Sequence, residues 1–229
     1  MPQPIHCHPR AFHLFAGYLA SADTNEGLLR AVAAISMHEL ESAEPEEVAR
    51  RLSGLAQRVR ARLRSNRVDA VLAHLHEVLF EEEGFAGNTE DYFNPYNSYL
   101  PAVLESRRGI PITLSLIYKV VGEQLGLRIE GVNAPGHFLA RLRIDDGMML
   151  VDPFAGGRLL TPEEAIERIE EVTGRTVLPG GRYLAIATHR VWLARVLVNL
   201  QNIFASLGRS DDLAAMVELQ SLVQEAPPQ

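Results

Sequence analysis

His137 and Asp152 are the two residues whose types and spacing point most directly to chemistry. They lie at the ends of two short stretches, residues 137–144 and 148–152, which carry the pattern of neighbouring strands. In the first stretch apolar and polar side chains alternate, as they do in a strand with one buried face. We therefore predict two antiparallel strands with the histidine near the start of one and the aspartate at the end of the other.

The turn between these strands is predicted at Asp145-Asp146-Gly147, a sequence typical of a tight hairpin. A turn centred on its last two residues sets Asp152 opposite Arg141, and a turn centred on its first two sets Asp152 opposite Leu139. In either register Asp152 and His137 project from the same face of the sheet, because side chains alternate with period two. A histidine oriented by a carboxylate supplies two of the three groups of a nucleophilic triad. The alternative is a core histidine that bonds Asp152 only to satisfy two buried polar groups.

A buried helix is predicted just before these strands, over residues 112–125. Apolar residues cover most of its surface, which indicates a helix surrounded by protein. Pro111 suits its first position and Gly126 its end. The predicted order in this part of the chain is buried helix, strand, strand, strand.

A polar, aromatic-containing loop over residues 83–96 leads to a short helix that is capped by Asn97 or Ser98, and then to Pro111. We expect this route to bring further polar side chains into a cleft beside His137, with two arginines as donors to an anion. The alternative is that Asn and Tyr cap turns and pack the edges of elements. The candidates for the cleft are Asn88, Tyr92, Asn97, Tyr99, Arg107 and Arg108.

The rest of the chain reads mainly as helices, predicted over residues 11–19, 25–40, 45–63, 67–82, 189–207 and 211–224. A capping box at Thr161 starts one more helix, and Gly174 ends it. The sequence LPGG, at residues 178–181, is the best linker signal. The fold class is thus α+β. Its predicted parts are a disordered terminus (1–10), a helical region (11–82), a core of one buried helix and a small antiparallel sheet (83–178), and a helical hairpin packed on the core (182–225).

Composition excludes several classes of protein. A net charge of −7 argues against nucleic-acid binding, which requires clustered positive charge. The arginines between residues 58 and 67 are expected to form a solvated face balanced by acidic residues rather than a phosphate site. A single cysteine excludes an intramolecular disulfide, and His6-Cys7-His8 lacks the further ligands of a metal site. We therefore expect a cytoplasmic protein with no cofactor, no metal and no contact with membranes.

Together the buried helix, His137 and Asp152 resemble the transglutaminase-like (papain-like cysteine protease) core. That core places a nucleophilic cysteine at the start of a buried helix, a histidine on the second strand after it, and an aspartate in a V-D-P sequence at the end of the third. The resemblance puts RGIP at the helix start, GHF at the histidine and Val151-Asp152-Pro153 at the aspartate. The position of the cysteine falls on Pro111, which has neither a thiol nor a backbone N–H.

The whole pattern is most similar to the SirB-type branch of this superfamily, in which proline is usual at this position. The motifs are GFAGN, NSYLPAVLESRRGIPITL, GVNAPGHFLARL and VDPFAGGRLL, and WLARVLVNLQNIF resembles the tetratricopeptide-like tail of that branch. The resemblance implies a non-catalytic binding or regulatory protein, with a protein or peptide partner in the cleft or on the C-terminal helices. The alternative is a hydrolase of amides or esters that uses His137 and Asp152 with Ser115 or an activated water. Ser115 lies about 40° around the helix from Pro111 and one turn deeper.

Overall fold

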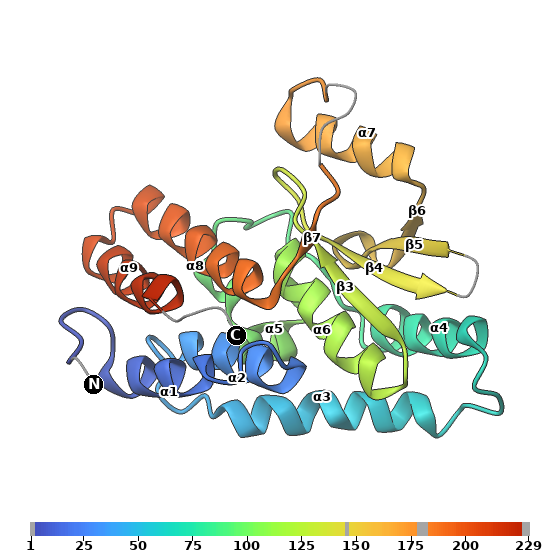
Figure 1. Ribbon diagram of the computed structural model, residues 1–229, viewed down its shortest axis with the longest axis horizontal. Helices are drawn as coiled ribbons and strands as arrows, with labels where there is room; N and C mark the ends of the chain where they lie inside the picture. Colours follow the sequence, from blue (N-terminus) through green and yellow to red (C-terminus); the bar gives the residue numbers. More distant parts are fainter. Residues whose placement is uncertain (1–2, 145–146, 178–182, 226–229) are drawn as a thin grey trace. The chain divides into compact units, whose positions relative to one another are not determined.

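The computed structural model describes residues 3–144, 147–177 and 183–225, and its chain divides into two compact units. Unit 1 comprises Met1–Arg51, Thr89–Ser106 and Thr188–Gln229, and unit 2 comprises Leu52–Asn88 and Arg107–Ala187. The helices that lie in unit 1 are α1 (Pro9–Leu19), α2 (Asn25–Ser36), the first part of α3 (Pro45–Arg60), the 3-10 helix η2 (Pro95–Ser98), α5 (Leu100–Ser106), α8 (His189–Ser206) and α9 (Ser210–Glu225) (Figure 1).

Unit 1 is a helical body in which the C-terminal hairpin packs on the N-terminal helices. α8 lies against α9 and α2, and α1 lies against α2 and α9. The interior contains Trp192, Phe15 and Phe204, each fully buried. The hairpin that the sequence predicts after the linker is therefore present as α8 and α9, although the linker itself, residues 178–181, lies outside the described residues.

The N-terminal segment was predicted to be disordered over residues 1–10, and its described part, from residue 3, makes defined contacts. α1 already begins at Pro9, because proline fits the first turn of a helix. The backbone N–H groups of Ile5, His6 and Cys7 donate to the carboxylate of Glu218 on α9. These bonds lower the pKa of Glu218 although its burial acts to raise it.

Unit 2 contains the end of α3, both sheets and the buried helix. Its helices are α4 (Val68–His76), the π-helix η1 (Glu77–Glu82), α6 (Pro111–Gln124), the 3-10 helix η3 (Pro153–Ala155) and α7 (Pro162–Thr173). Twelve residues of α6, from Pro111 to Gly122, are buried, as the apolar residues around its whole surface predicted. α6 packs against the sheet strands β3 (Arg128–Val132) and β4 (Leu139–Ile144). The predicted buried helix is thus the element against which the sheet is built.

The main sheet is antiparallel and has the strand order β6-β5-β4-β3-β7. Its other strands are β5 (Gly147–Asp152), β6 (Arg158–Leu160) and β7 (Ile186–Ala187), and a separate parallel pair joins β1 (Ala86–Gly87) to β2 (Arg108–Gly109). The predicted α+β class is therefore confirmed. In the described residues β4 pairs with β5 through Ala140 and Val151. Extended by one pair, this register sets Asp152 opposite Leu139, the second of the two predicted registers, although residues 145–146 lie outside the described residues.

The capping signals in the sequence predicted both ends of α7 correctly. Thr161 accepts a hydrogen bond from the backbone of Glu164, the carboxylate of Glu164 accepts one from the backbone of Thr161, and Gly174 ends the helix in the left-handed conformation. The helix predicted over residues 67–82 is instead α4 followed by a π-helical turn, in which the N–H of Glu83 donates to the carbonyl of Val78. Periodicity alone does not distinguish the two kinds of turn, because both continue the same run of residues.

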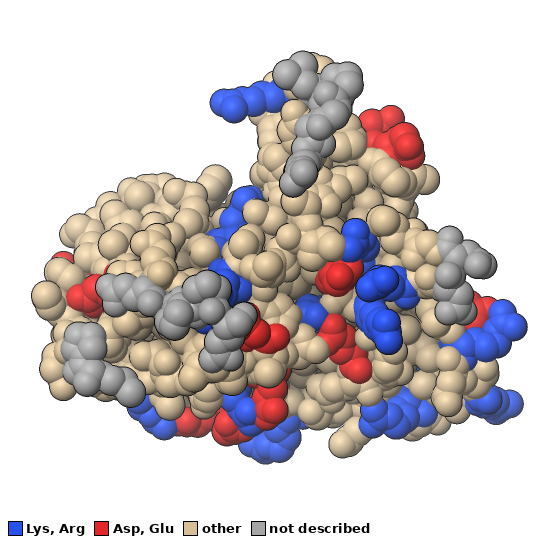
Figure 2. Space-filling model, in the orientation of Figure 1, with Lys and Arg blue, Asp and Glu red and all other residues tan. Residues whose placement is uncertain are grey.

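Arginines at the C-terminal end of α3 and just after it are paired with acidic residues of the same unit. Arg58 lies within ion-pair distance of Glu82 and Glu83, and Arg62 within ion-pair distance of Glu77 and Glu82. On the face drawn in Figure 2, basic and acidic side chains are interspersed. In the described ranges no helix is both long and apolar enough to cross a membrane.

Candidate functional site

The start of α6 sits at the end of a strained connection. Ile110 is extended and precedes the helix, and Pro111 occupies its first turn. Arg107 has a φ of 61°, which for a residue other than glycine costs on the order of 1 kcal/mol. Its guanidinium lies over the ring of Phe85 at 5.0 Å from the centroid and pairs with Glu83 at 2.5 Å. These two contacts hold the guanidinium of Arg107 in place.

Backbone hydrogen bonds fix the side chain of Asp152. Its Oδ1 accepts hydrogen bonds from the backbone N–H groups of Phe154 at 3.0 Å and Ala155 at 3.3 Å, so the residue is the N-cap of η3. Pro153, the first residue of η3, needs no such bond. The V-D-P sequence therefore has a local explanation: a strand ends, its last carboxylate caps the next turn, and proline starts that turn. The other carboxylate oxygen, Oδ2, bonds to a second partner.

That partner is His137. Its Nε2 lies 2.9 Å from Oδ2 of Asp152, and the two side chains are only 3% and 2% exposed. The ring of Phe154 meets the imidazole edge-on, with centroids 5.9 Å apart. Because Asp152 is fixed by its own turn, it fixes the orientation of the histidine ring. Within the described residues no hydrogen bond is assigned to the other ring nitrogen, Nδ1.

His137 itself lies in the loop before β4 rather than in the strand, which corrects the predicted strand boundary at residue 137. The backbone turns at Gly136, which has a φ of 67°, and the N–H of His137 donates to the carbonyl of Ala134 at 3.3 Å. The alternating pattern begins at His137 because it shares the parity of the strand, but ladder pairing starts only at Leu139.

Two contacts bring the histidine loop and the aspartate turn to α6. The hydroxyl of Ser115, one turn after Pro111, donates to the carbonyl of Phe138 at 3.4 Å. α6 also packs against η3, the turn that Asp152 caps. Ser115 is fully buried and already bonded, so it does not present its hydroxyl at a surface. The first turns of α6 thus lie beside the residues that follow His137 and Asp152 in the chain.

Three of the predicted cleft residues belong to unit 1. Tyr99 is fully buried and donates its hydroxyl hydrogen to Glu39 at 2.6 Å. Asn97 is 4% exposed and donates its side-chain amide to the carbonyls of Asp91 and Tyr92. Tyr92 is 36% exposed. The bonds of Asn97 and Tyr99 fit the alternative in which such residues hold a loop in place.

The other three predicted cleft residues belong to unit 2. Asn88 follows β1, and its N–H donates to the carbonyl of Gly109. Arg107 pairs with Glu83 as described, and Arg108, on β2, donates to the carbonyl of Gly84 at 2.8 Å. Ser115 of α6 was also a candidate for the cleft, and the cleft that would unite these six residues and Ser115 with His137 remains a prediction.

Unit 2 also holds a half-buried histidine, His76, that the sequence did not predict as part of a site. Nε2 of His76 lies 2.9 Å from the hydroxyl of Tyr118, a residue of α6, and the ring of Phe80 packs on both. Burial lowers the pKa of His76 to about 4 and raises that of Tyr118. Tyr118 lies two turns after Pro111 on the same side of α6. No motif marks this pair, because its members are 42 residues apart.

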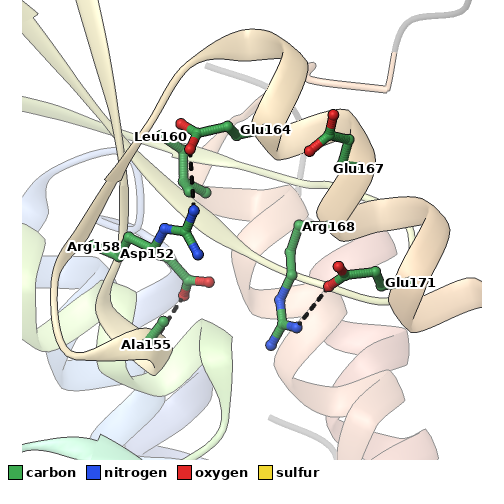
Figure 3. Close-up of a pocket in the computed structure, with 8 residues that line it drawn as sticks. All are labelled: Asp152, Ala155, Arg158, Leu160, Glu164, Glu167, Arg168 and Glu171. Carbon is green, nitrogen blue, oxygen red and sulfur yellow. Dashed lines mark hydrogen bonds and ion pairs between the residues drawn. The ribbon is translucent and has the colours of Figure 1, made fainter.

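A charged pocket of about 190 Å³ adjoins Asp152 on the side of β6 and α7 (Figure 3). Its lining includes Arg158 and Arg168, each paired with a glutamate of α7. A larger pocket of about 550 Å³ is lined by Gly136 and the C-terminal end of α7. Neither pocket was predicted, since the residues of each come together only when α7 folds back over the sheet.

The fold and the site together define the class of this protein. Residues 46–198 match the family described as "Transglutaminase-like superfamily", and the chain belongs to that superfamily. A buried helix followed by a small antiparallel sheet agrees with the fold expected from the sequence. No solved structure matches the chain.

Relatives cover different shares of the chain. A UPF0162 protein of Xylella fastidiosa (strain 9a5c) is 42% identical over 161 residues, which is 68% of this chain and 57% of the relative. A UPF0162 protein of Pseudomonas aeruginosa is 29% identical over 205 residues, 87% of this chain and 72% of the relative. F-box only protein 21 of Mus musculus is 42% identical over 103 residues, 41% of this chain and 16% of the relative. The match thus spans little more than half of the Xylella relative.

Proposed function

We propose that this protein is a binding or regulatory module of the transglutaminase-like superfamily that keeps the His137–Asp152 pair but not the nucleophile. The observation that carries the proposal is Pro111 in the first turn of α6, the place that the resemblance gives to the catalytic cysteine. A helix start favours a thiolate there, but proline offers no group that the helix dipole can activate. Proline at this position is also what the SirB-type resemblance predicts.

The other side chains able to act as nucleophiles support the same proposal. Cys7, the one cysteine of the chain, belongs to unit 1. Burial is the main cause that raises the pKa of its thiol to about 12, and the negative charge of Glu218 is the second cause. A thiol with so high a pKa is almost never a thiolate at neutral pH. Ser115 and Thr113 are both buried within α6.

A protein or peptide is the partner we propose, in the cytoplasm and without a cofactor. The net charge of −7 supports a partner other than nucleic acid. On the C-terminal hairpin, Val191, Leu207 and Val217 are 39%, 51% and 52% exposed, which supports this hairpin as a second place for contact.

The alternative is a hydrolase that uses the His–Asp pair to activate water. It is favoured by one observation: Asp152 orients the ring of His137 through a 2.9 Å hydrogen bond, as a general base requires. The version of this alternative that uses Ser115 is weaker, because the Ser115 hydroxyl is buried and donates to Phe138.

An activity comparison separates these functions. We expect the wild-type protein and the Cys7→Ser variant to be equally unable to incorporate a fluorescent amine into a glutamine-containing protein. We also expect hydrolysis of p-nitrophenyl acetate to be the same for wild type, His137→Ala and Ser115→Ala. Amine incorporation that disappears in Cys7→Ser contradicts the proposal. Ester hydrolysis that disappears in His137→Ala, while that variant stays folded, favours the hydrolase.

A binding selection tests the positive part of the proposal. Peptides displayed on phage would be selected on the immobilised wild-type protein, and the enriched peptides would be measured against variants. We expect binding to fall with Phe154→Ala, which removes the ring beside His137, and to be unchanged with Arg143→Gln, an exposed position on β4. Enrichment that neither variant affects would place the contact away from the His–Asp pair and contradict this part.

A further inference from the structure

The pocket between β6 and α7 is lined mainly by charged residues, and Pro111 is not among the residues that line it. It holds about 190 Å³, enough for a small organic molecule. Both of its guanidinium groups and four carboxylates contribute to its lining (Figure 3). These residues are Asp152, Arg158, Glu164, Glu167, Arg168 and Glu171.

Asp152 bounds the pocket but is already occupied. Its oxygens accept from the backbone of Phe154 and Ala155 and lie in bonding distance of His137. A carboxylate offers about four positions for hydrogen bonds, and three of them are used here. A ligand in the pocket therefore lies next to the charge that orients His137, and Asp152 has little capacity left to bind it.

The two guanidinium groups still have donors to offer. Arg158 donates to Glu164 at 3.0 Å, and Glu164 is in turn held by the backbone of Thr161. Arg168 donates to Glu171 at 3.2 Å, and the side chain of Arg168 is half as exposed as that of Glu171, at 34% against 67%. Each guanidinium has five N–H donors. In Figure 3 the two guanidinium groups lie on two sides of the same space, each bonded to its own glutamate. Two like charges around one space favour a bridging anion.

The net charge of the pocket sets a second condition on a ligand, in addition to a negative group between the two arginines. Four carboxylates against two guanidiniums leave a net charge of −2, so a simple anion gains little from the pocket as a whole. The carboxylates that are not held by backbone bonds are those of Glu167 and Glu171, both exposed on α7. A ligand that places a carboxylate between the arginines and a cationic group beside these glutamates satisfies both conditions.

We propose that this pocket binds a small zwitterion, an α-amino acid. Its carboxylate lies between Arg158 and Arg168 and its ammonium group lies toward Glu167 and Glu171. Because the charged groups are largely exposed, the dissociation constant is expected on the order of 1 mM. The proposal does not depend on the function of the His–Asp pair.

The test is a titration of the ¹⁵N-labelled full-length chain, followed by NMR at constant ionic strength. L-alanine is the probe, and N-acetyl-L-alanine and L-alaninamide are its matched controls, since the first lacks the ammonium group and the second the carboxylate. We expect saturable shifts at amides of residues 158–171 with L-alanine and none with the controls. Arg168→Gln should weaken binding by about tenfold or more, through the loss of a charged hydrogen bond, and Glu163→Gln, on α7 but outside the pocket lining, should leave it unchanged.

Three results would overturn the proposal. The first is the absence of saturable shifts with L-alanine. The second is binding of N-acetyl-L-alanine or L-alaninamide as tight as that of L-alanine, because the zwitterion would then not be what is recognised. The third is unaltered binding to a folded Arg168→Gln protein. None of these results bears on the assays of amine incorporation and ester hydrolysis, so the two proposals fail independently.

Discussion

Two histidines of this protein make the same bond in different surroundings. His137 lies 2.9 Å from Asp152 in unit 2, and His38 lies 2.9 Å from Asp212 in unit 1. Nδ1 of His38 accepts the backbone N–H of His8, and Asp212 also accepts from Arg209. Both ring nitrogens of His38 are therefore used. For His137 a bond is assigned only to Nε2 within the described residues.

The comparison shows that a histidine bonded to a carboxylate is not by itself a sign of chemistry. His38 joins α9 to the N-terminal segment, and its bonds are accounted for by packing within unit 1. His137 differs because its carboxylate is fixed by backbone groups and its ring meets Phe154. Two features therefore separate a structural His–Asp pair from a candidate site. They are the groups that fix the carboxylate and the hydrogen-bond partner of the second imidazole nitrogen.

The largest expected difference between the pairs is in stability. Asp152→Ala removes an N-cap and a buried partner together and should lower the free energy of unfolding by about 3–5 kcal/mol. Asp212→Ala acts at a side chain that is 24% exposed and should cost about 1–2 kcal/mol. Urea unfolding of both variants measures the difference. Asp152→Asn, which keeps an acceptor for the cap, should lie between them, and equal costs for the two alanine variants would contradict the comparison.

His76 extends the comparison to a histidine that is bonded to a tyrosine hydroxyl rather than to a carboxylate. The folded protein protonates His76 at a pKa of about 4 and the unfolded chain at about 6.5, so acidification through this window favours the unfolded chain. After allowance for partial exposure, the loss should be about 2 kcal/mol between pH 6.5 and pH 4. His76→Gln cannot titrate, so its stability should fall less over this window. Parallel curves for the variant and the wild type would mean that His76 is not buried in its neutral form.

A smaller effect tests the packing of the ring beside His137. A methyl group added at Gly87 would lie 2.4 Å from the ring of Phe154, so Gly87→Ala must displace that ring, at a cost of about 1 kcal/mol. Gly54→Ala, where nothing lies within 4 Å, should instead stabilise α3 by up to about 1 kcal/mol. In NMR spectra the imidazole signals of His137 should move in Gly87→Ala and those of His38 should not. Unmoved His137 signals would show that Phe154 does not determine the surroundings of its ring.

The fold was largely readable from the sequence, and the reasons are local. Period two puts His137 and Asp152 on one face whichever turn joins the strands, and the apolar surface of residues 112–125 predicts the burial of α6. Capping signals fixed the start of α7, because a capping box uses residues only three apart.

What the sequence did not predict depends on contacts between distant segments. Asp152 followed by Pro153 is a local N-cap signal, but the role of this carboxylate as the cap of η3 depends on how the chain turns after β5. Tertiary packing brings together pairs of residues whose spacing in the sequence does not predict a contact. These pairs are Phe154 and His137, His76 and Tyr118, and Arg158 and Arg168. The placement of Asn97 and Tyr99 in unit 1 likewise follows from the packing of η2 on α8 and from the bond between Tyr99 and Glu39 rather than from their place in the loop.

The central claim is that His137 and Asp152 converge on the start of α6, where Pro111 stands in place of a nucleophile. A thiol introduced there tests it, in a Cys7→Ser background, by the pH dependence of alkylation with iodoacetamide. Pro111→Cys should cost no more than about 1 kcal/mol, because Pro111 contributes no N–H bond to α6. Pro162→Cys is the matched control, since Pro162 also stands in the first turn of a helix, α7, but has no histidine partner among the described contacts.

We predict that the thiol at position 111 titrates below about 8.5, the value of a free cysteine, and that His137→Ala raises its pKa by about one unit. The thiol at position 162 should respond to its helix alone and not to His137→Ala. If burial of position 111 slows alkylation, the ¹³C shift of the labelled cysteine reports the same pKa. A folded Pro111→Cys protein whose thiol pKa is unchanged by His137→Ala would contradict the account.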